Sequence, residues 1–361
     1  MDPRVHEHAE VVVDDCTAVE PGDNVIVQAP PVAEDLVVAV HELLGERGAN
    51  PTLSWSSSRA HRAYMRAADA DSFELPDHAL AQMEAADVVI QILGATNTNE
   101  TSDVPPEKTA ARSRVRKPLQ EAHMQTRWVL TQHPTPANAQ EAEMSTEAYA
   151  AFVYDAVNKD WDAQHEHQAQ LVELLDPASE VRIVSGETTD VTMSVEGNPA
   201  CNDAGEKNMP AGEVFTAPLP DSVEGEVLFD KPLIVQGREV TDARLVFEGG
   251  EVVEHSAAKN EDVLTAMLNT DDGARRLGEL GIGMNRDIDR FTYNMLFDEK
   301  MGDTVHMAVG KSIGESVGEA NEGNDSSVHT DMIVDMSEDS YIEVDGEVVQ
   351  RDGTFVFEDG F

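Results

Sequence analysis

The chain has 361 residues, of which 70 are Asp or Glu and 25 are Lys or Arg, so its formal net charge is −45. An apolar share of 40% is ordinary for a folded protein, and the acidity therefore does not indicate disorder. This length predicts two domains, each able to bury its own core. A surface this negative repels phosphate, so we expect no nucleic-acid partner.

The acidic residues are spread along the whole chain and are not gathered in one block. A local block would be typical of a tail that binds basic partners. An even spread instead favours a halophilic surface, because exposed like charges repel one another and salt shortens the range of that repulsion. We therefore expect a protein that requires concentrated salt.

The start of the chain, Met1 to His6, lacks the apolar run of a signal peptide, and no segment is apolar for long enough to span a membrane. The sequence thus predicts a soluble, cytoplasmic protein without membrane contact. Cys16 and Cys201 are the two cysteines, and they lie far apart without CxxC spacing. Neither a disulfide framework nor a zinc knuckle is indicated.

Strands and helices alternate over residues 1–136. This pattern predicts an α/β domain with a mostly parallel sheet. A helix beginning near Val32 is expected to end at Gly48, and Asp87–Leu93 is a continuous apolar run typical of a buried parallel strand. The other expected elements are helices over His6–Cys16 and Pro106–Gln125 and strands over Asn24–Gln28, Pro51–Trp55 and Arg127–Gln132.

Residues 137–178 have a helical pattern that breaks near Asp160, and we interpret them as a helical connector. Short strands at regular spacing then predict a metal-binding α+β domain over residues 179–361, rich in antiparallel strands and barrel-like. One helix is expected at Asn260–Gly278. A hairpin with Asp-Gly at its turn is expected at Tyr341–Val349.

Four residues within this domain are of the types that bind divalent metals: Glu279, His306, His329 and Asp331. On a strand, the side chains of His329 and Asp331 point to the same face, as ligands of one ion or of an ion pair would. Spacing alone leaves plainer interpretations open. These are a hydrogen-bonded His-Asp pair, a core histidine at 306, a helix-end salt bridge at Glu279 and, at Glu213, a solvated glutamate beside a turn.

Four segments in order carry a resemblance: Gly212–Pro218, Glu279–Gly283, Asp298–His306 and Val328–Met332. Together with the opening Val19–Val27, they resemble the thermophilic aminopeptidase T, or aminopeptidase S, family of metallopeptidases across nearly the whole chain. The acidic composition further indicates a haloarchaeal-type member.

The resemblance implies a two-domain homodimer whose C-terminal domain holds two divalent ions of Zn, Co or Mn. The matching ligand positions are Glu213, Glu279, His306, His329 and Asp331. Such a centre removes N-terminal residues from short peptides, since two cations activate a shared water and polarise the scissile carbonyl. Either Glu213 or Glu279 is implied as the residue that carries the proton to the leaving amine.

One position departs from the family. A tyrosine follows the first histidine by seven residues in the family, and this chain has Ile313 there. Loss of one transition-state donor can cost about a hundredfold in rate, so a metal-binding relative with weakened peptidase activity is one alternative. The other is a ring-opening dioxygenase of hydroxypyridines, which resembles this fold and holds one ferrous ion with two histidines and an aspartate. His306, His329 and Asp331 satisfy that pattern.

The stretch 108–117 is basic in an otherwise acidic chain. Three interpretations stay open for it: an internal salt-bridge face, a dimer contact or an access route for an anionic substrate. Its basic residues are Lys108, Arg112, Arg114, Arg116 and Lys117.

Overall fold

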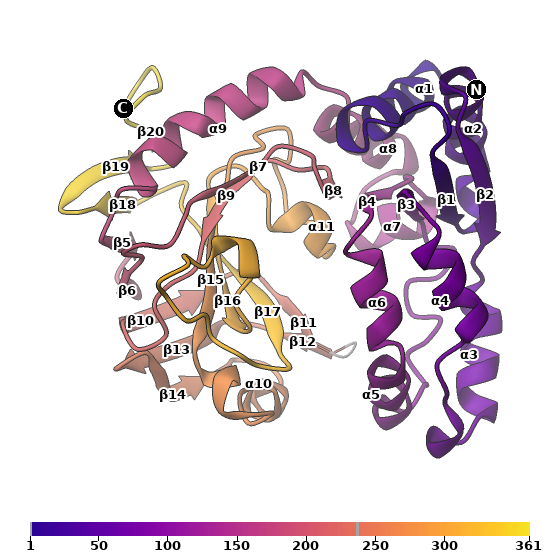
Figure 1. The fold of residues 1–361 in the computed structure, drawn as a ribbon. Coiled ribbons are helices and arrows are strands. Elements are labelled where there is room, and N and C mark those ends of the chain that lie inside the picture. The colour runs from indigo at the N-terminus through magenta and orange to yellow at the C-terminus, as the bar shows by residue number, and fades with distance from the viewer. Residues whose placement is uncertain (1, 236–237) are drawn as a thin grey trace. The chain divides into compact units, whose positions relative to one another are not determined.

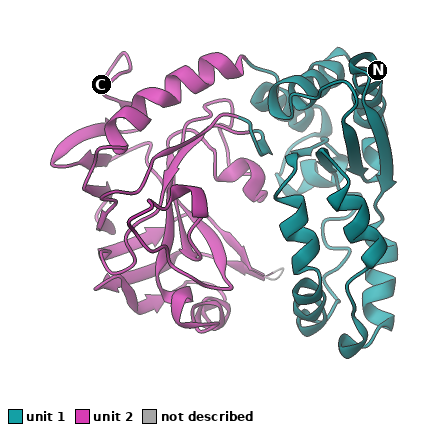
Figure 2. Cartoon of the chain, in the orientation of Figure 1, with its two compact units in different colours: residues 1–159, 205–210 teal, residues 160–204, 211–361 magenta. Residues whose placement is uncertain are grey.

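The computed structural model describes residues 2–235 and 238–361, and they form two compact units (Figure 2). Unit 1 contains residues 1–159 and 205–210, and unit 2 contains residues 160–204 and 211–361. Each unit has its own sheets, and the short segment 205–210 belongs to the first although the sequence around it belongs to the second. No helix among the described residues is long and apolar enough to cross a membrane.

Unit 1 is built on a parallel sheet with strand order β2-β1-β3-β4-β8 (Figure 1). The apolar runs of β1 and β3 lie in its centre, as their continuous burial requires. The chain adds β2 on one side of β1 and β3 on the other, so the order reverses between β1 and β3. The strands are β1 (Asn24–Ala29), β2 (Asn50–Trp55), β3 (Val88–Leu93), β4 (Arg127–Gln132) and β8 (Asn208–Met209).

Helices connect these strands, which confirms the α/β expectation. Gly48, in a left-handed conformation with φ of 74°, ends α2 as predicted. The helices are α1 (Pro3–Glu10), which continues as the π-helix η1 (Val11–Cys16), α2 (Glu34–Arg47), α3 (Ser58–Ala67), α4 (Asp77–Glu84), α5 (Pro106–Val115), α6 (Lys117–His123), α7 (Pro136–Glu141) and α8 (Thr146–Val157), with short 3-10 turns η2 (Pro31–Ala33) and η3 (Ala70–Ser72).

The single helix expected at Pro106–Gln125 is wrong, because the chain forms two helices that meet at Arg116. Pro118 has no backbone N–H and its ring clashes with the carbonyl four residues earlier, so a continuous helix cannot pass through it. The helical stretch 137–178 is also divided. Its α7 and α8 lie in unit 1, whereas α9 (Trp161–Leu175) begins unit 2 after Asp160 accepts a hydrogen bond from Ala163 N.

Unit 2 contains two large antiparallel sheets, as expected for the C-terminal part. The eight-stranded sheet has the order β14-β13-β10-β6-β5-β18-β19-β20, and the five-stranded sheet has the order β17-β16-β15-β9-β7. The first sheet comprises β5 (Glu180–Ser185), β6 (Thr189–Ser194), β10 (Glu224–Phe229), β13 (Ala243–Glu248), β14 (Glu251–Ser256), β18 (Ser340–Val344), β19 (Glu347–Arg351) and β20 (Thr354–Phe355).

The five-stranded sheet comprises β7 (Cys201–Asp203), β9 (Glu213–Thr216), β15 (Leu277–Gly283), β16 (Thr304–Gly310) and β17 (His329–Asp335). The expected Asp-Gly hairpin is confirmed between β18 and β19, where Asp345 and Gly346 both have positive φ. The remaining elements are the hairpin β11 (Leu233–Val235) and β12 (Arg238–Val240), helices α10 (Glu261–Leu268) and α11 (Met295–Asp298), and turns η4 (Asp272–Arg275) and η5 (Gly314–Ser316).

The helix expected at Asn260–Gly278 is wrong in its second half, because α10 ends at Leu268. Asp271 then accepts a hydrogen bond from Ala274 N and begins the separate turn η4. The chain continues into β15, which starts at Leu277. This early end places Glu279 on a strand.

The core of unit 2 lies between its two sheets. Phe229 and Phe247 of the larger sheet belong to the same apolar cluster as Leu280, Val305 and Met307 of the five-stranded sheet. The side chains of a strand alternate between its two faces. Residues at the intervening positions of β15 and β16 therefore point to the opposite face, and that face carries the candidate site.

Candidate metal centre

The five predicted ligands share one face of the five-stranded sheet. Residues paired directly across antiparallel strands point to the same side. Glu279 and Asp331 flank Ala308 of the strand between them, while His306 pairs with Gly281 and Glu213 pairs with Gly283. The pairing register alone thus gathers residues that are more than a hundred positions apart in sequence.

Small residues opposite the ligands make room for them. A Cβ atom added at Gly281 would lie 2.0 Å from His306 Cε1, so the imidazole occupies the space that any side chain at 281 would need. Ala308 similarly stands between the two carboxylates of Glu279 and Asp331. Sequence reasoning gave Gly281 no role, although a glycine directly across from a buried histidine is the signal that identifies it.

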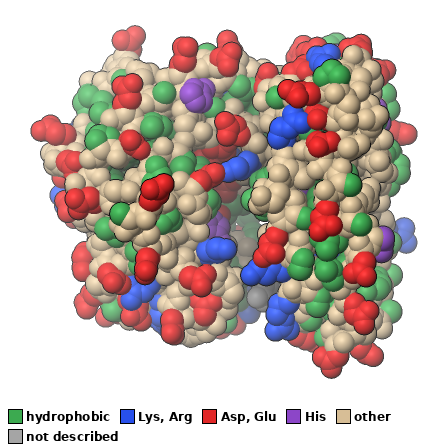
Figure 3. Space-filling model, viewed as in Figure 1, with side chains coloured by type: hydrophobic (Ala, Val, Ile, Leu, Met, Phe, Trp, Pro, Cys, Tyr) green, Lys and Arg blue, Asp and Glu red, His purple; other side chains and the backbone are tan. Residues whose placement is uncertain are grey.

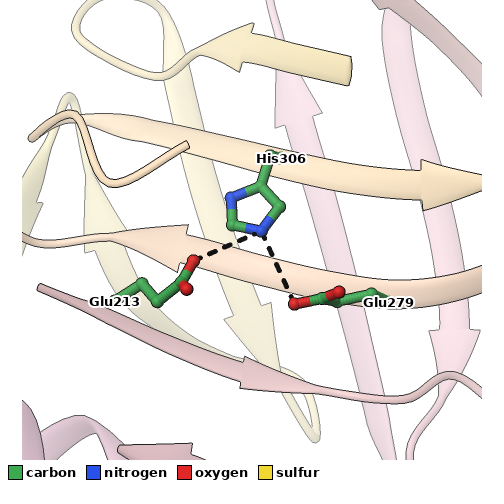
Figure 4. Close-up of side chains that lie close together, drawn as sticks. All are labelled: Glu213, Glu279 and His306. Carbon is green, nitrogen blue, oxygen red and sulfur yellow. Dashed lines mark ion pairs between the residues drawn. The ribbon is translucent and has the colours of Figure 1, made fainter. Parts of the chain in front are cut away.

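The first group of candidate ligands is Glu213, Glu279 and His306, shown in Figure 4. All three are buried, each with at most 6% of its surface exposed. His306 Nε2 lies 3.4 Å from Glu213 Oε2 and 3.7 Å from Glu279 Oε1. Their side chains converge from β9, β15 and β16 on one point.

The second group is Glu279, His329 and Asp331. His329 Nε2 lies 3.2 Å from Glu279 Oε2 and 3.6 Å from Asp331 Oδ1. Its side chain keeps 34% of its surface exposed, so this end of the site opens outward. Glu279 belongs to both groups and uses a different oxygen toward each histidine.

The two histidines are oriented by backbone carbonyls. His306 Nδ1 donates a hydrogen bond to Glu299 O at 2.9 Å, and His329 Nδ1 donates one to Lys311 O at 2.8 Å. Because a carbonyl only accepts, each neutral ring carries its proton on Nδ1 and turns a bare Nε2 toward the carboxylates. This arrangement, in which an outer carbonyl fixes the ring, is the usual one for histidines that bind metals.

The site has more acceptors than donors. Within residues 2–235 and 238–361, Glu213 Oε2 and Glu279 Oε2 have no hydrogen-bond partner although both atoms are buried. His329 Nε2 approaches Glu279 Oε2 but is not aligned for a hydrogen bond. Buried unpaired carboxylate oxygens are costly unless a cation compensates them. The oxygen and imidazole donors present therefore fit divalent ions.

The pKa values of the histidines respond to the same charges. Burial alone would lower the pKa of His306, but the facing carboxylates Glu279 and Glu213 outweigh it and raise that pKa to about 10. Burial also opposes the charge on His329, whereas Glu279 and Asp331 raise its pKa to about 9. Without a metal, this environment therefore binds protons, which again shows that it attracts cations.

Three further charged residues border the first group. Lys300 is fully buried, and its Nζ lies 3.0 Å from Glu213 Oε1, forms a short ion pair with Glu299 and lies 4.0 Å from Asp203 Oδ2. Burial disfavours the ammonium ion, but Glu213 and Glu299 outweigh it and raise the pKa of Lys300. Glu299 and Lys300 lie in a motif that the sequence displayed, yet no role followed from it. Asp203 had no sequence signal, since only its pairing with Glu213 reveals it.

Ile313 lies just before η5, and its carbonyl accepts hydrogen bonds from Ser316 N and Oγ. Ser312 Oγ accepts a hydrogen bond from Asn324 N at 2.9 Å. Both serines are buried. The Ser316 hydroxyl is therefore not a ready replacement for a phenol at position 313.

Similar proteins give this site a family context. The chain is 27% identical to aminopeptidase 2 of Geobacillus stearothermophilus, over 98% of this chain and 97% of that protein. Among solved structures, wild-type AmpT from Thermus thermophilus matches with a TM-score of 0.87 and 24% identity, over 98% of this chain and 99% of that one. 2,5-Dihydroxypyridine dioxygenase from Pseudomonas putida KT2440 matches with a TM-score of 0.64 and 15% identity, over 99% of each chain.

The two structural matches establish the fold only, so the chemistry is inferred from the sequence match. The sequence matches the family described as thermophilic metalloprotease (M29) over residues 1–361, which confirms the resemblance seen in the four motifs. The chain therefore belongs to the thermophilic metalloprotease (M29) family, and it is a metal-dependent hydrolase of peptide bonds.

Proposed function

We propose that this protein is an aminopeptidase that holds two divalent ions and releases N-terminal residues from short peptides. The observation that carries the proposal is the position of Glu279, which belongs to two ligand groups at once. With one oxygen toward each group, Glu279 would be able to help hold both ions. Glu213 and His306 complete the first group, and His329 and Asp331 complete the second.

The local charge supports two ions rather than one. Besides the three ligand carboxylates, Glu299 and Asp203 lie around Lys300. With these five carboxylates ionised, Lys300 charged and both histidines neutral, the site carries four negative charges. Two divalent cations would balance them, whereas one would leave a buried excess of negative charge, which is unfavourable.

Bound divalent ions supply a water of lowered pKa and polarise the scissile carbonyl. The protein residues provide orientation and proton transfer. Lys300 holds one oxygen of Glu213, which leaves the other free to face the site. Glu213 is one candidate for carrying a proton to the leaving amine, because its second carboxylate oxygen faces the site. Glu279 is the second candidate for that proton transfer.

The dioxygenase alternative is less well supported. It needs His306, His329 and Asp331 around one ion, but His306 falls in one group and the other two residues fall in the second. It also leaves Glu213 and Glu279 without a role. The similarity to the dioxygenase structure is at 15% identity and reaches only the fold.

The proposal is tested on protein purified in concentrated KCl. We expect about two divalent ions per chain by elemental analysis, with the identity among Zn, Co and Mn read from the same measurement. A free peptide should lose its N-terminal residue in a chelator-sensitive reaction, while the same peptide with an acetylated N-terminus should not react. One iron per chain, with oxygen uptake on a hydroxypyridine, would contradict the proposal.

Four expectations from the sequence belong to this proposal and stay predictions. They are the homodimer, the cytoplasmic location, the haloarchaeal-type origin and the requirement for salt. Figure 3 shows Asp and Glu side chains distributed over the visible face of the molecule, which is the pattern on which the salt expectation rests.

A further inference from the structure

Unit 1 contains a pocket of about 280 Å³ on the sheet face that α4 and α6 cover. Its floor is polar. Gln28 of β1 and Gln91 of β3 are paired across the sheet and both line the pocket. They stand on the same face as the buried residues Ile26 and Val89, two positions closer to the carboxyl ends of the strands. The apolar layer under the helices thus ends in two amides.

The wall of the pocket is positively charged. Arg112 near the end of α5 and Arg116 at the junction with α6 both line it, together with Ser113 and Gln120. Both arginine side chains are partly buried. In residues 2–235 and 238–361, no carboxylate forms an ion pair with either guanidinium, although Arg62 and Arg66 of the same unit both bind Asp103.

The rest of the basic stretch is engaged differently. Lys117 pairs with Glu121, and Lys108 Nζ donates to the carbonyls of Arg66 and Ala68. An internal salt-bridge face therefore does not account for Arg112 and Arg116. In a chain with 70 acidic residues, two adjacent arginines without a carboxylate are electrostatically unusual.

The positive charges around the pocket repel one another. Burial and the charge of Arg112 lower the pKa of Arg116. Burial and the charges of both arginines also lower the pKa of His61. Two guanidinium groups that line one pocket without a counter-ion repel each other, and a bound anion would relieve that repulsion.

The position in the sheet is one at which α/β proteins bind ligands. The strand order reverses between β1 and β3, the two strands that supply Gln28 and Gln91. Open parallel sheets bind ligands near the carboxyl ends of the strands at such a reversal. The pocket, the two amide side chains and the reversal of strand order therefore lie at the same place in the sheet.

We propose that this pocket binds a small phosphate-type oxyanion, either inorganic phosphate or a phosphate monoester. The two guanidinium forks hold its oxygens in pairs, and the amides of Gln28 and Gln91 donate to those that remain. A tetrahedral anion presents oxygens on several sides and so uses donors from both the floor and the wall, whereas a carboxylate presents two oxygens in one plane. This site lies in unit 1 and does not depend on the chemistry of the metal centre.

The test uses the full chain in KCl buffer. Inorganic phosphate is titrated calorimetrically against chloride at matched ionic strength, because any salt screens a chain with a net charge of −45. The variants are Arg112→Gln and Arg116→Gln. The matched control is Arg114→Gln on the same helix, since Arg114 is exposed and does not line the pocket. Phosphate can also bind to ions at the candidate metal centre. Weaker binding in the Arg112→Gln and Arg116→Gln variants therefore shows that the phosphate is bound in this pocket.

We expect saturable binding of phosphate that weakens about tenfold or more in each pocket variant and is unchanged in Arg114→Gln. In chloride alone, the pocket variants should be no less stable to urea than the parent, because each removes an unpaired charge. The proposal is overturned if phosphate binds all variants equally, or if acetate binds this pocket and phosphate does not. It is also overturned if the pocket variants are destabilised without phosphate, since that would give the arginines a structural role.

Discussion

The imidazole of His306 lies over the α-carbon of Gly281, so closely that a Cβ atom at position 281 would be 2.0 Å from Cε1 of the ring. The two residues pair directly across β15 and β16. The candidate centre therefore requires glycine at position 281, because any side chain there would overlap the imidazole.

Gly281→Ala should displace the His306 ring and lower the metal content of the protein. A methyl group cannot share this space, and the buried ring has little room to move. Elemental analysis and peptidase rate measure the effect. Gly45→Ala is the matched control, because a Cβ there meets nothing within 4 Å and α2 should tolerate it. Two ions per chain and full activity in Gly281→Ala would show that the ring is not a ligand.

Glu279→Gln and His329→Ala should differ in the number of ions they lose. Glu279 faces both groups, so its amide should weaken both ion positions, whereas His329 belongs only to the second. We expect nearly two ions lost in the first variant and about one in the second. Glu254→Gln, at an exposed position on β14, is the control for loss of an acidic charge. Equal losses in both variants would argue against a bridging carboxylate.

Lys300→Met should destabilise the protein much more than Lys259→Met. Lys300 is fully buried against Glu213 and Glu299, and its removal leaves buried carboxylates uncompensated at a cost of about 3–5 kcal/mol. Lys259 pairs with Glu239 at the surface, where such a pair contributes at most about 1 kcal/mol. Urea unfolding at constant KCl gives both values. Similar losses would mean that the Lys300 cluster does not stabilise the fold.

Ile313→Tyr should raise the rate of peptide cleavage, by up to about a hundredfold, if a phenol near the metals stabilises the transition state. Ile313→Phe adds the same ring without the hydroxyl and should not raise the rate. The change is expected in kcat, since a transition-state donor does not tighten substrate binding. Equal rates in parent and Tyr variant would show that Ile313 does not limit turnover.

Asp271 should stabilise the loop before β17 in a pH-dependent way. Its carboxylate accepts hydrogen bonds from the hydroxyls of Ser326 and Ser327, which lower its pKa from 3.8 to about 2. Because the pKa is lowered on folding, the contribution is complete above pH 3.8 and disappears as the pH falls toward 2. Asp271→Asn lacks it throughout.

The check for Asp271 is the difference in unfolding free energy between parent and Asp271→Asn as the pH is lowered. That difference should shrink on acidification, whereas a constant difference would mean that the carboxylate charge plays no part. His329 follows this loop directly in the sequence. Asp271→Asn should therefore also bind the ion of the second ligand group less tightly.

The sequence by itself determined the elements whose signals are local. The buried runs of β1 and β3, the end of α2 at Gly48 and the Asp-Gly turn at 345–346 follow from side-chain type and backbone preference alone. Two helices expected from the sequence were wrong, because the residue pattern does not show where a local interaction interrupts a helix. Pro118 split one expected helix, and another ended at Leu268, before the hydrogen bond to Asp271 begins the separate turn η4.

The candidate ligands could be named from the sequence because metal ligands come from few residue types, and because four motifs in order carried a family resemblance. Their assembly was decided only by tertiary structure. Strand register set Gly281 against His306 and Asp203 against Glu213, and burial joined Lys300 to Glu213. These relations connect residues far apart in the chain, and no local propensity encodes them, because register and burial exist only once the sheet has formed.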